Sequence, residues 1–202
     1  ANNISAYVFD SLRATPELSF AVRELNATSG IVITASHNPP EYNGYKVYWE
    51  DGAQITSPKD VEIIDEVNTI TDYNAIKSMP REEAIHSGLY TVIDSTMDDN
   101  YIAELKKLII DPEVIKKEAK DFTIVYTPLH GTGNIPVRRI LKEIGFEDVY
   151  VVKEQELPDG NFPTVSYPNP EDIKAFELAI KLGLEKNADV IMATDPDADR
   201  LG

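Results

Sequence analysis

Short apolar runs alternate with longer amphipathic stretches along the first half of the chain, and this alternation predicts an α/β fold. Residues 4–9 (ISAYVF), 30–34 (GIVIT) and 45–49 (YKVYW) are rich in β-branched and aromatic side chains, which favours strands. Residues 15–25 lie between the first two strands and are expected to form a helix, with Thr15 as its cap and a proline next to it. The order strand, helix, strand predicts two parallel strands joined by a crossover helix.

The pattern starts again near residue 93, which predicts a second α/β unit. Buried-looking strands and amphipathic helices alternate from there to the end, so we expect mixed, mostly parallel sheets flanked by helices and place a boundary between residues 1–93 and 94–202. The further elements expected are helices from residue 58, near 80–85, from 95, at 135–144 and at 169–184, and strands at 90–94, 122–127, 148–152 and 189–194.

The balance of charges narrows the possible ligands. The 202 residues include 19 Lys and Arg against 35 Asp and Glu, a net charge of −16, with no block of basic residues. Such a chain is a poor partner for nucleic acid or an anionic membrane surface, so neither is expected. The absence of Cys excludes a disulfide scaffold, a thiolate zinc site and cysteine catalysis. No apolar run approaches the roughly 20 residues of a membrane helix, and we expect a cytoplasmic protein.

A serine follows the second predicted strand, in the segment Thr34-Ala35-Ser36-His37-Asn38-Pro39. A hydroxyl group at a strand end, held in a rigid turn, is a candidate nucleophile or phosphate carrier. Ser, Asn and Pro are also ordinary turn residues, so a plain turn is the alternative. Because neighbouring side chains tend to point apart, we expect no Ser36–His37 dyad.

The second candidate site is the segment Asp195-Pro196-Asp197-Ala198-Asp199-Arg200, which follows the last predicted strand. Alternate residues of an extended loop project to the same side, so three carboxylates can converge on a hard cation such as Mg²⁺. An EF-hand loop needs Gly at its sixth position, where this chain has Arg200. An aspartyl-phosphate phosphatase and a solvated acidic turn remain as alternatives. A third loop, His130 to Asn134, fails the dinucleotide fingerprint because Pro136 stands in place of the third glycine, and it is interpreted mainly as a close-packing turn.

Together these motifs resemble the α-D-phosphohexomutase family of phosphoglucomutases and phosphomannomutases. The resemblance covers nearly the whole chain, and residues 46–55 (KVYWEDGAQI) are most similar to the phosphoglucomutase branch, which includes phosphopentomutases. Further matching segments are Asn43-Gly44-Tyr45-Lys46, Thr127-Pro128-Leu129-His130-Gly131, Phe162-Pro163 and Pro168-Asn169-Pro170-Glu171.

The resemblance implies a role for each residue of these loops. Ser36 matches the serine that is phosphorylated in the working enzyme. Asp195, Asp197 and Asp199 match the Mg²⁺ ligands, with a phosphoryl oxygen on Ser36 completing the set. By the same resemblance Lys46 serves proton transfer or charge stabilisation, His37 lies near the reacting groups, and Arg200 closes the metal loop and contributes to substrate phosphate binding.

The implied reaction moves phosphate between C1 and C6 of a hexose through phospho-Ser36 and a sugar bisphosphate. Members of the family have four domains, and the resemblance assigns residues 1–93 to the C-terminal part of domain I and 94–202 to most of domain II. Without the missing domains we expect no turnover, and uncovered sheet edges are expected to favour self-association. The sugar stays open between glucose, mannose, an amino sugar and a pentose, and a non-catalytic cation-binding module is a further alternative.

Overall fold

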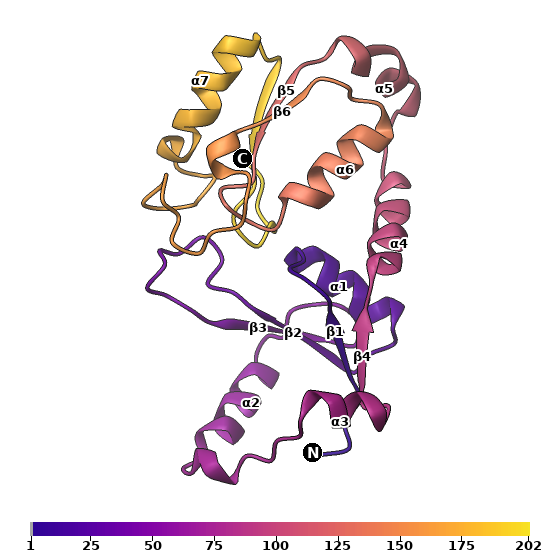
Figure 1. Ribbon diagram of the computed structural model, residues 1–202, viewed down its shortest axis with the longest axis vertical. Coiled ribbons are helices and arrows are strands. Elements are labelled where there is room, and N and C mark those ends of the chain that lie inside the picture. The colour runs from indigo at the N-terminus through magenta and orange to yellow at the C-terminus, as the bar shows by residue number, and fades with distance from the viewer. Residues whose placement is uncertain (1) are drawn as a thin grey trace.

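The computed structural model describes residues 2–202 and shows two α/β units, one above the other in Figure 1. The N-terminal unit holds two two-stranded sheets, and the C-terminal unit holds one three-stranded parallel sheet with the order β6-β5-β7. Helix α4, Ser95–Lys106, leads from one unit to the other along one side of the molecule. Mixed, mostly parallel sheets flanked by helices are what the sequence predicts, so the expected fold class is confirmed.

The elements of the N-terminal unit lie close to their predicted positions. Apolar spacing located the helices well, although the start of α1 differs: its N-cap is Ala14, and Thr15 is the first helical residue, so the predicted capping role of Thr15 was wrong. The elements are β1 (Ala6–Phe9), α1 (Thr15–Glu24), β2 (Ser29–Ile33), β3 (Tyr45–Trp49), α2 (Lys59–Asn68), the 3-10 helix η1 (Tyr73–Ala75), α3 (Arg81–His86) and β4 (Tyr90–Ile93).

The C-terminal unit also follows the predicted order. The segment expected to be one helix from residue 169 is divided, because Asp172 caps a short 3-10 helix that precedes the α-helix. After α4 the elements are α5 (Pro112–Glu118), η2 (Ala119–Asp121), β5 (Ile124–Thr127), α6 (Asn134–Ile144), β6 (Val149–Val151), η3 (Lys153–Gln155), η4 (Ile173–Phe176), α7 (Glu177–Lys186) and β7 (Val190–Ala193).

The pairing of the first two strands differs from the prediction. β1 pairs in parallel with β4, and β2 pairs antiparallel with β3, so β1 and β2 do not form the expected parallel pair. Their other edges line a groove of about 1640 Å³, and α1 also contributes to its lining. The crossover rule applies only to strands of one sheet, and these two belong to different sheets.

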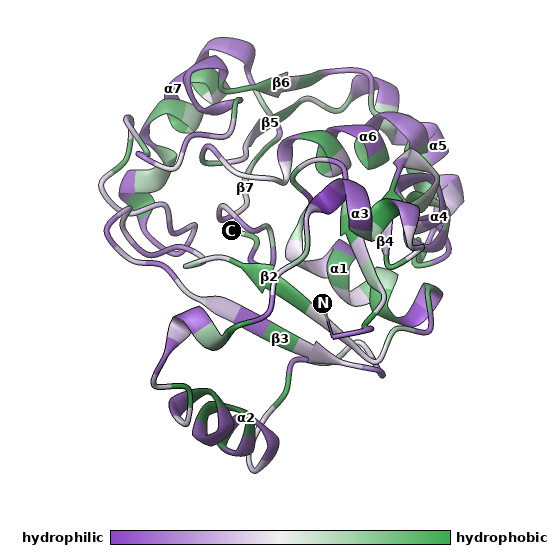
Figure 2. Ribbon diagram, turned by 60° about the horizontal axis from the view of Figure 1, so that its bottom comes forward, coloured by the Kyte–Doolittle hydropathy of each residue, from purple (hydrophilic) through white to green (hydrophobic). Residues whose placement is uncertain are grey.

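The core of the C-terminal unit lies around β5, which is buried along its whole length. Val125 packs with Val152 and with Ala179 of α7 in one apolar cluster. Figure 2 shows the apolar strands β5 and β6 between α6 and α7. Because parallel strands point the same way, the loops after β5 and β7 emerge at the same edge of the sheet.

Helix α2 contrasts with this core. The predicted apolar spacing is present, but Val61, Ile64 and Val67 are all exposed, and the helix stands away from the sheets. Among residues 2–202, every helix is too short or too polar to cross a membrane.

Candidate active site

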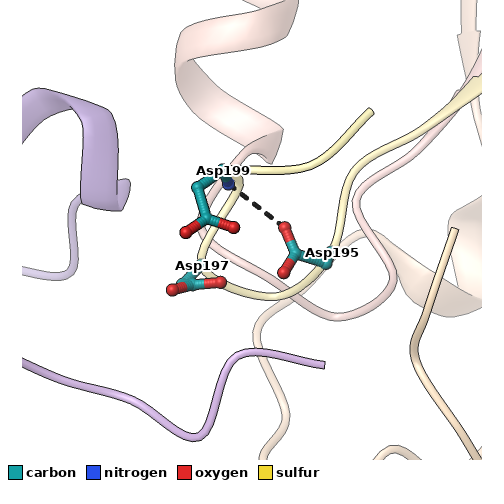
Figure 3. A group of neighbouring side chains, drawn as sticks. All are labelled: Asp195, Asp197 and Asp199. Carbon is teal, nitrogen blue, oxygen red and sulfur yellow. Dashed lines mark hydrogen bonds between the residues drawn. The ribbon is translucent and has the colours of Figure 1, made fainter. Parts of the chain in front are cut away.

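The acidic loop follows β7 and folds back on itself. Asp195, Asp197 and Asp199 each bring a carboxylate oxygen within 4.8 Å of the others, and Figure 3 shows the three side chains converging. The Oδ1 atom of Asp195 accepts hydrogen bonds from the backbone N–H groups of Asp199 and Arg200, at 3.1 and 3.0 Å. The loop is therefore wound around the first carboxylate, and the three aspartates converge as predicted, but through a turn with a left-handed Ala198 rather than through the expected extended loop.

A close contact behind the acidic loop holds it in place. A Cβ atom on Gly131 would lie 2.4 Å from the Cα atom of Pro196, so no larger residue fits there without displacing the loop. The N–H group and the hydroxyl of Thr132 both donate to the carbonyl oxygen of Pro196, at 2.8 and 3.0 Å. The interpretation of this segment as a close-packing turn is consistent with these contacts.

The serine loop connects β2 and β3 and reaches the acidic loop from the N-terminal unit. The backbone N–H of Ser36 donates to Oγ1 of Thr34 at 2.8 Å, and the backbone of Ser36 is left-handed, with φ of 55°. The Ser36 hydroxyl donates to Oδ2 of Asp195 at 2.9 Å. Two loops from different units thus place the candidate nucleophile directly on the carboxylate cluster.

His37 differs from the prediction, because its side chain does contact Ser36. Its Nδ1 atom lies 3.1 Å from the Ser36 hydroxyl oxygen. The left-handed backbone at Ser36 changes the direction of neighbouring side chains, which diverge only in extended chain. The imidazole also packs edge-on against Tyr167, with ring centroids 5.5 Å apart. Burial, followed by the charge of Arg200, lowers the pKa of His37 and favours a neutral ring.

Lys46 extends from β3 and pairs with two of the three aspartates. Its ammonium nitrogen lies 2.7 Å from Oδ2 of Asp197 and 2.6 Å from Oδ2 of Asp199. Burial acts to lower the pKa of Lys46, but the hydrogen bonds to the two carboxylates outweigh it and raise the pKa above its usual value. Lys46 is therefore a fixed positive charge at this site.

The carboxylates differ in their electrostatic surroundings. Burial, reinforced by the neighbouring Asp197, raises the pKa of Asp195 to about 7. Burial acts to raise the pKa of Asp197, but the hydrogen bonds and the charge that Lys46 and its other neighbours supply together outweigh burial and lower that pKa. Like charges held this close repel unless a cation compensates them. One ammonium cannot balance three carboxylates. The cluster therefore carries excess negative charge, which a divalent cation would neutralise.

One oxygen atom of Asp197 points more directly to a cation site. Oδ1 of Asp197 is buried and has no hydrogen-bond partner. An unsatisfied buried acceptor costs about 1–3 kcal/mol, and a charged one more, so such an atom points to a missing ligand. The donor set consists of carboxylate oxygens with a serine oxygen beside them, which is the chemistry that Mg²⁺ prefers. The residues present therefore fit the expected ion.

Arg200 lies at the edge of the cluster. Its guanidinium donates to Glu171 at 2.9 Å, on the loop before α7. The structure thus brings together Ser36, His37, Lys46 and the three aspartates, and places Arg200 beside them in a separate ion pair. Its expected role toward substrate phosphate stays a prediction.

One contact at this site had no signal in the sequence. Thr15, at the start of α1, is almost completely buried, and its hydroxyl donates to Oδ2 of Asp197 at 3.0 Å. Pattern reasoning assigned it only to helix capping, because a hydrogen bond across 182 positions leaves no local trace.

Comparison with known proteins follows the same division into units. The family profile described as "Phosphoglucomutase/phosphomannomutase, alpha/beta/alpha domain II" matches residues 99–202, which is more than half of the chain, and the corresponding domain I profile matches residues 1–74. The chain belongs to the phosphoglucomutase/phosphomannomutase family. Members of this family with these names are isomerases.

Individual relatives agree with the family. A Haemophilus influenzae protein named "Probable phosphomannomutase" is 41% identical over 98% of this chain, and a Staphylococcus saprophyticus phosphoglucomutase is 40% identical over all of it. A crystal structure from Thermus thermophilus, assigned as a phosphomannomutase, superposes with a TM-score of 0.77 at 27% identity, covering 99% of this chain and 41% of that one. The chain spans 39% and 36% of the two curated relatives' lengths.

Proposed function

We propose that this chain carries the phosphoserine loop and the metal loop of a phosphoglucomutase-type enzyme, which interconverts hexose 1-phosphate and hexose 6-phosphate. Ser36 is the phosphoryl carrier, and Asp195, Asp197 and Asp199 are the ligands of Mg²⁺. The observation that carries this proposal is the hydrogen bond from the Ser36 hydroxyl to Asp195, because it joins the two loops at the atoms that must act together. The protein acts in the cytoplasm on sugar phosphates.

In the first half-reaction a hydroxyl oxygen of the sugar phosphate forms a bond to phosphorus while the bond from phosphorus to the Ser36 oxygen breaks. The sugar hydroxyl loses a proton and Ser36 gains one, so atoms and charge balance. A neutral His37, 3.1 Å from the serine oxygen, is placed to pass that proton on. The second half-reaction returns the other phosphate of the sugar bisphosphate to Ser36 and regenerates the enzyme.

Charge neutralisation is the main task of the surrounding residues. Phosphoserine adds about −1.5 to −2 charge beside three carboxylates. Mg²⁺ supplies electrostatic stabilisation of the phosphoryl oxygens when bound. Because Lys46 stays protonated, it stabilises negative charge rather than accepting a proton. Positioning and electrostatics of this kind account for most of the catalysis of phosphoryl transfer.

A specific contact favours this function over an aspartyl-phosphate phosphatase. Both carboxylate oxygens of Asp195 already accept hydrogen bonds, one from Ser36 and the other from two backbone N–H groups. An aspartyl-phosphate phosphatase needs no serine on this carboxylate, so it leaves the contact from Ser36 unexplained. A non-catalytic cation-binding module explains the acidic loop but not the serine loop seated on it. Phosphomannomutase or phosphopentomutase specificity remains the alternative within the family.

The 202-residue chain alone is expected to be inactive. It spans well under half the length of its curated relatives, so more than half of each of those proteins has no counterpart in these 202 residues. Purified at this length, it should not interconvert glucose 1-phosphate and glucose 6-phosphate at an enzymic rate, as followed in a coupled dehydrogenase assay. Enzymic turnover by the 202-residue chain would contradict this expectation.

The test of the proposed function uses the protein at its natural length. Ser36→Ala should reduce the interconversion of glucose 1-phosphate and glucose 6-phosphate by roughly a thousandfold or more, since it removes the phosphoryl carrier. Ser78→Ala, at an exposed position of the N-terminal unit, serves as the matched control and should retain full activity. Removal of Mg²⁺ with a chelator should abolish activity, and added Mg²⁺ should restore it. Full activity of Ser36→Ala would refute the proposal.

A further inference from the structure

Helix α1 meets the acidic loop at its first residue, Thr15. The backbone N–H of Thr15 donates to the carbonyl oxygen of Asp197 at 2.8 Å, and the Thr15 hydroxyl donates to Oδ2 of the same residue at 3.0 Å. One residue of the N-terminal unit therefore holds both the main chain and the side chain of one residue of the C-terminal unit. The contact is closed to solvent, since Thr15 is 1% exposed and Asp197 is 4% exposed.

The two hydrogen bonds satisfy groups that would otherwise lack partners. The first N–H groups of an α-helix have no acceptor within the helix, and the N-cap residue Ala14 offers no side-chain acceptor. The carbonyl of Asp197 accepts the Thr15 N–H in place of a capping side chain. Negative charge is also favoured near a helix N-terminus, where the carboxylate of Asp197 lies.

The contact fixes which oxygen of Asp197 is free. Oδ2 accepts from Thr15 and from Lys46, whose nitrogen lies at 2.7 Å. Oδ1 is buried and unpartnered. The hydroxyl of Thr15 and the ammonium of Lys46 together fix the rotation of the Asp197 carboxylate group. In that orientation Oδ1 is available to an ion bound by the three aspartates. The β-branched Thr15 side chain has few rotamers, so its hydroxyl is well placed to act as a fixed donor.

We propose that Thr15 is a positioning residue, which orients Asp197 for divalent cation binding. The proposal rests on the proposed function, because it takes Asp197 as a ligand of Mg²⁺. It goes further in assigning part of the metal affinity to a residue of the N-terminal unit that would not itself touch the ion. Hydrogen-bond partners that orient metal ligands commonly contribute tenfold to a hundredfold in affinity.

The test compares three variants at the natural length of the protein, with Mg²⁺ alone as the probe. Thr15→Val keeps the shape of the side chain and removes the hydroxyl donor, and we expect it to weaken Mg²⁺ binding about tenfold in isothermal titration calorimetry. Thr15→Ser keeps the donor and should bind Mg²⁺ within about twofold of the unchanged protein. Ser19→Ala removes a hydroxyl from the same helix, where it donates to Gly52 and not to the acidic loop, and it should leave the affinity unchanged.

The outcomes separate this proposal from the proposed function. Mg²⁺ affinity unaffected by Thr15→Val, or reduced equally by Ser19→Ala, would overturn the positioning role while leaving the metal site intact. Asp197→Asn with unchanged Mg²⁺ affinity would overturn the metal site itself and the positioning role with it. Thermal melting checks that each variant folds, and Thr15→Ala is the second hydroxyl-free variant should Thr15→Val not fold.

Discussion

At the scale of single residues, the chemistry of the site depends on which carboxylate oxygens are already engaged. Asp195 is engaged at both oxygens, by Ser36 and by the backbone of its own loop. Asp197 is engaged at one oxygen only and keeps the other buried and free. Asp195 therefore links the acidic loop to the serine, while Asp197 keeps one buried oxygen without a partner.

Lys46 provides the first prediction at this scale. Lys46→Met removes the ammonium that neutralises Asp197 and Asp199, so phosphoryl transfer should fall by roughly a hundredfold. Mg²⁺ should bind at least as tightly as before, because the cation no longer competes with an internal positive charge. Steady-state kinetics and Mg²⁺ titration on the same samples measure the two effects, with Lys77→Met at an exposed position as the control. Weaker Mg²⁺ binding with undiminished transfer would contradict the assigned role.

Residue-level reasoning from the sequence pointed to segments that the structure places side by side, and the roles of their residues stay predictions. The serine loop and the alternating aspartates are short motifs whose residue types suit one chemistry, and the structure brings them together. Thr15 has no such signal, because its partner is distant in the sequence. His37 was expected to point away from Ser36, and that prediction was wrong because a left-handed residue in the turn could not be foreseen from its neighbours.

At the scale of elements, helix α1 carries a buried carboxyl group, Glu17, two residues after Thr15. Glu17 is 2% exposed, its Oε1 atom has no hydrogen-bond partner, and Asp98 of α4 lies against it. Burial, reinforced by Asp98, raises the pKa of Glu17 to about 8. Arg13 pairs with Asp98 through two contacts of 2.6 and 2.9 Å. It therefore neutralises the carboxylate of Glu17 less than that of Asp98.

This raised pKa predicts the direction of a pH effect on stability. The folded protein binds the Glu17 proton more tightly than the unfolded chain, whose carboxyl titrates near 4.5. The stabilisation from that proton is therefore fully present below about pH 4.5 and is lost as pH rises through about 8. Between about pH 6 and pH 9 the melting temperature of the unchanged protein should fall by several degrees more than that of Glu17→Gln, which mimics the protonated form.

Differential scanning calorimetry across this pH range checks the prediction. Glu24→Gln is the matched control, because Glu24 ends the same helix at an exposed position, and it should follow the unchanged protein. An identical pH dependence of Glu17→Gln and the unchanged protein would show that Glu17 is already ionised in the fold.

Elements were predicted from the sequence better than their pairing was. Hydrophobic spacing located most strands and helices because it reflects burial within each element. Strand pairing depends on contacts distant along the chain, and β1 and β2 pair with β4 and β3 rather than with each other. The domain boundary placed between residues 1–93 and 94–202 stays a prediction.

At the scale of the whole molecule, the active-site atoms come from both units. Ser36 and Lys46 belong to the N-terminal unit, and the three aspartates belong to the C-terminal one. Any change in how the units pack therefore alters the distance between the Ser36 hydroxyl and the three aspartates. The groove between β1 and β2 leaves two strand edges without partners among the described residues, and such edges readily pair with another chain.

We expect the 202-residue chain, purified alone, to self-associate through these edges. Ile31 and Ile33 of β2 are 58% and 68% exposed and line the groove. Ile33→Lys should reduce self-association, because a charged side chain at an edge disfavours pairing between strands. Val114→Lys makes the same change on exposed α5 and is the control. Sedimentation velocity over a range of concentrations measures the effect, and a chain that stays monomeric throughout would contradict the expectation.

The role of Ser36 as phosphoryl carrier is open to direct measurement by phosphopeptide mass spectrometry across this residue, on the protein at its natural length as isolated from cells. We expect phosphate on Ser36 that exchanges with isotopically labelled hexose phosphate in the presence of Mg²⁺. An unmodified Ser36 both before and after incubation with substrate and Mg²⁺, in a protein that still binds the ion, would contradict the phosphoserine mechanism.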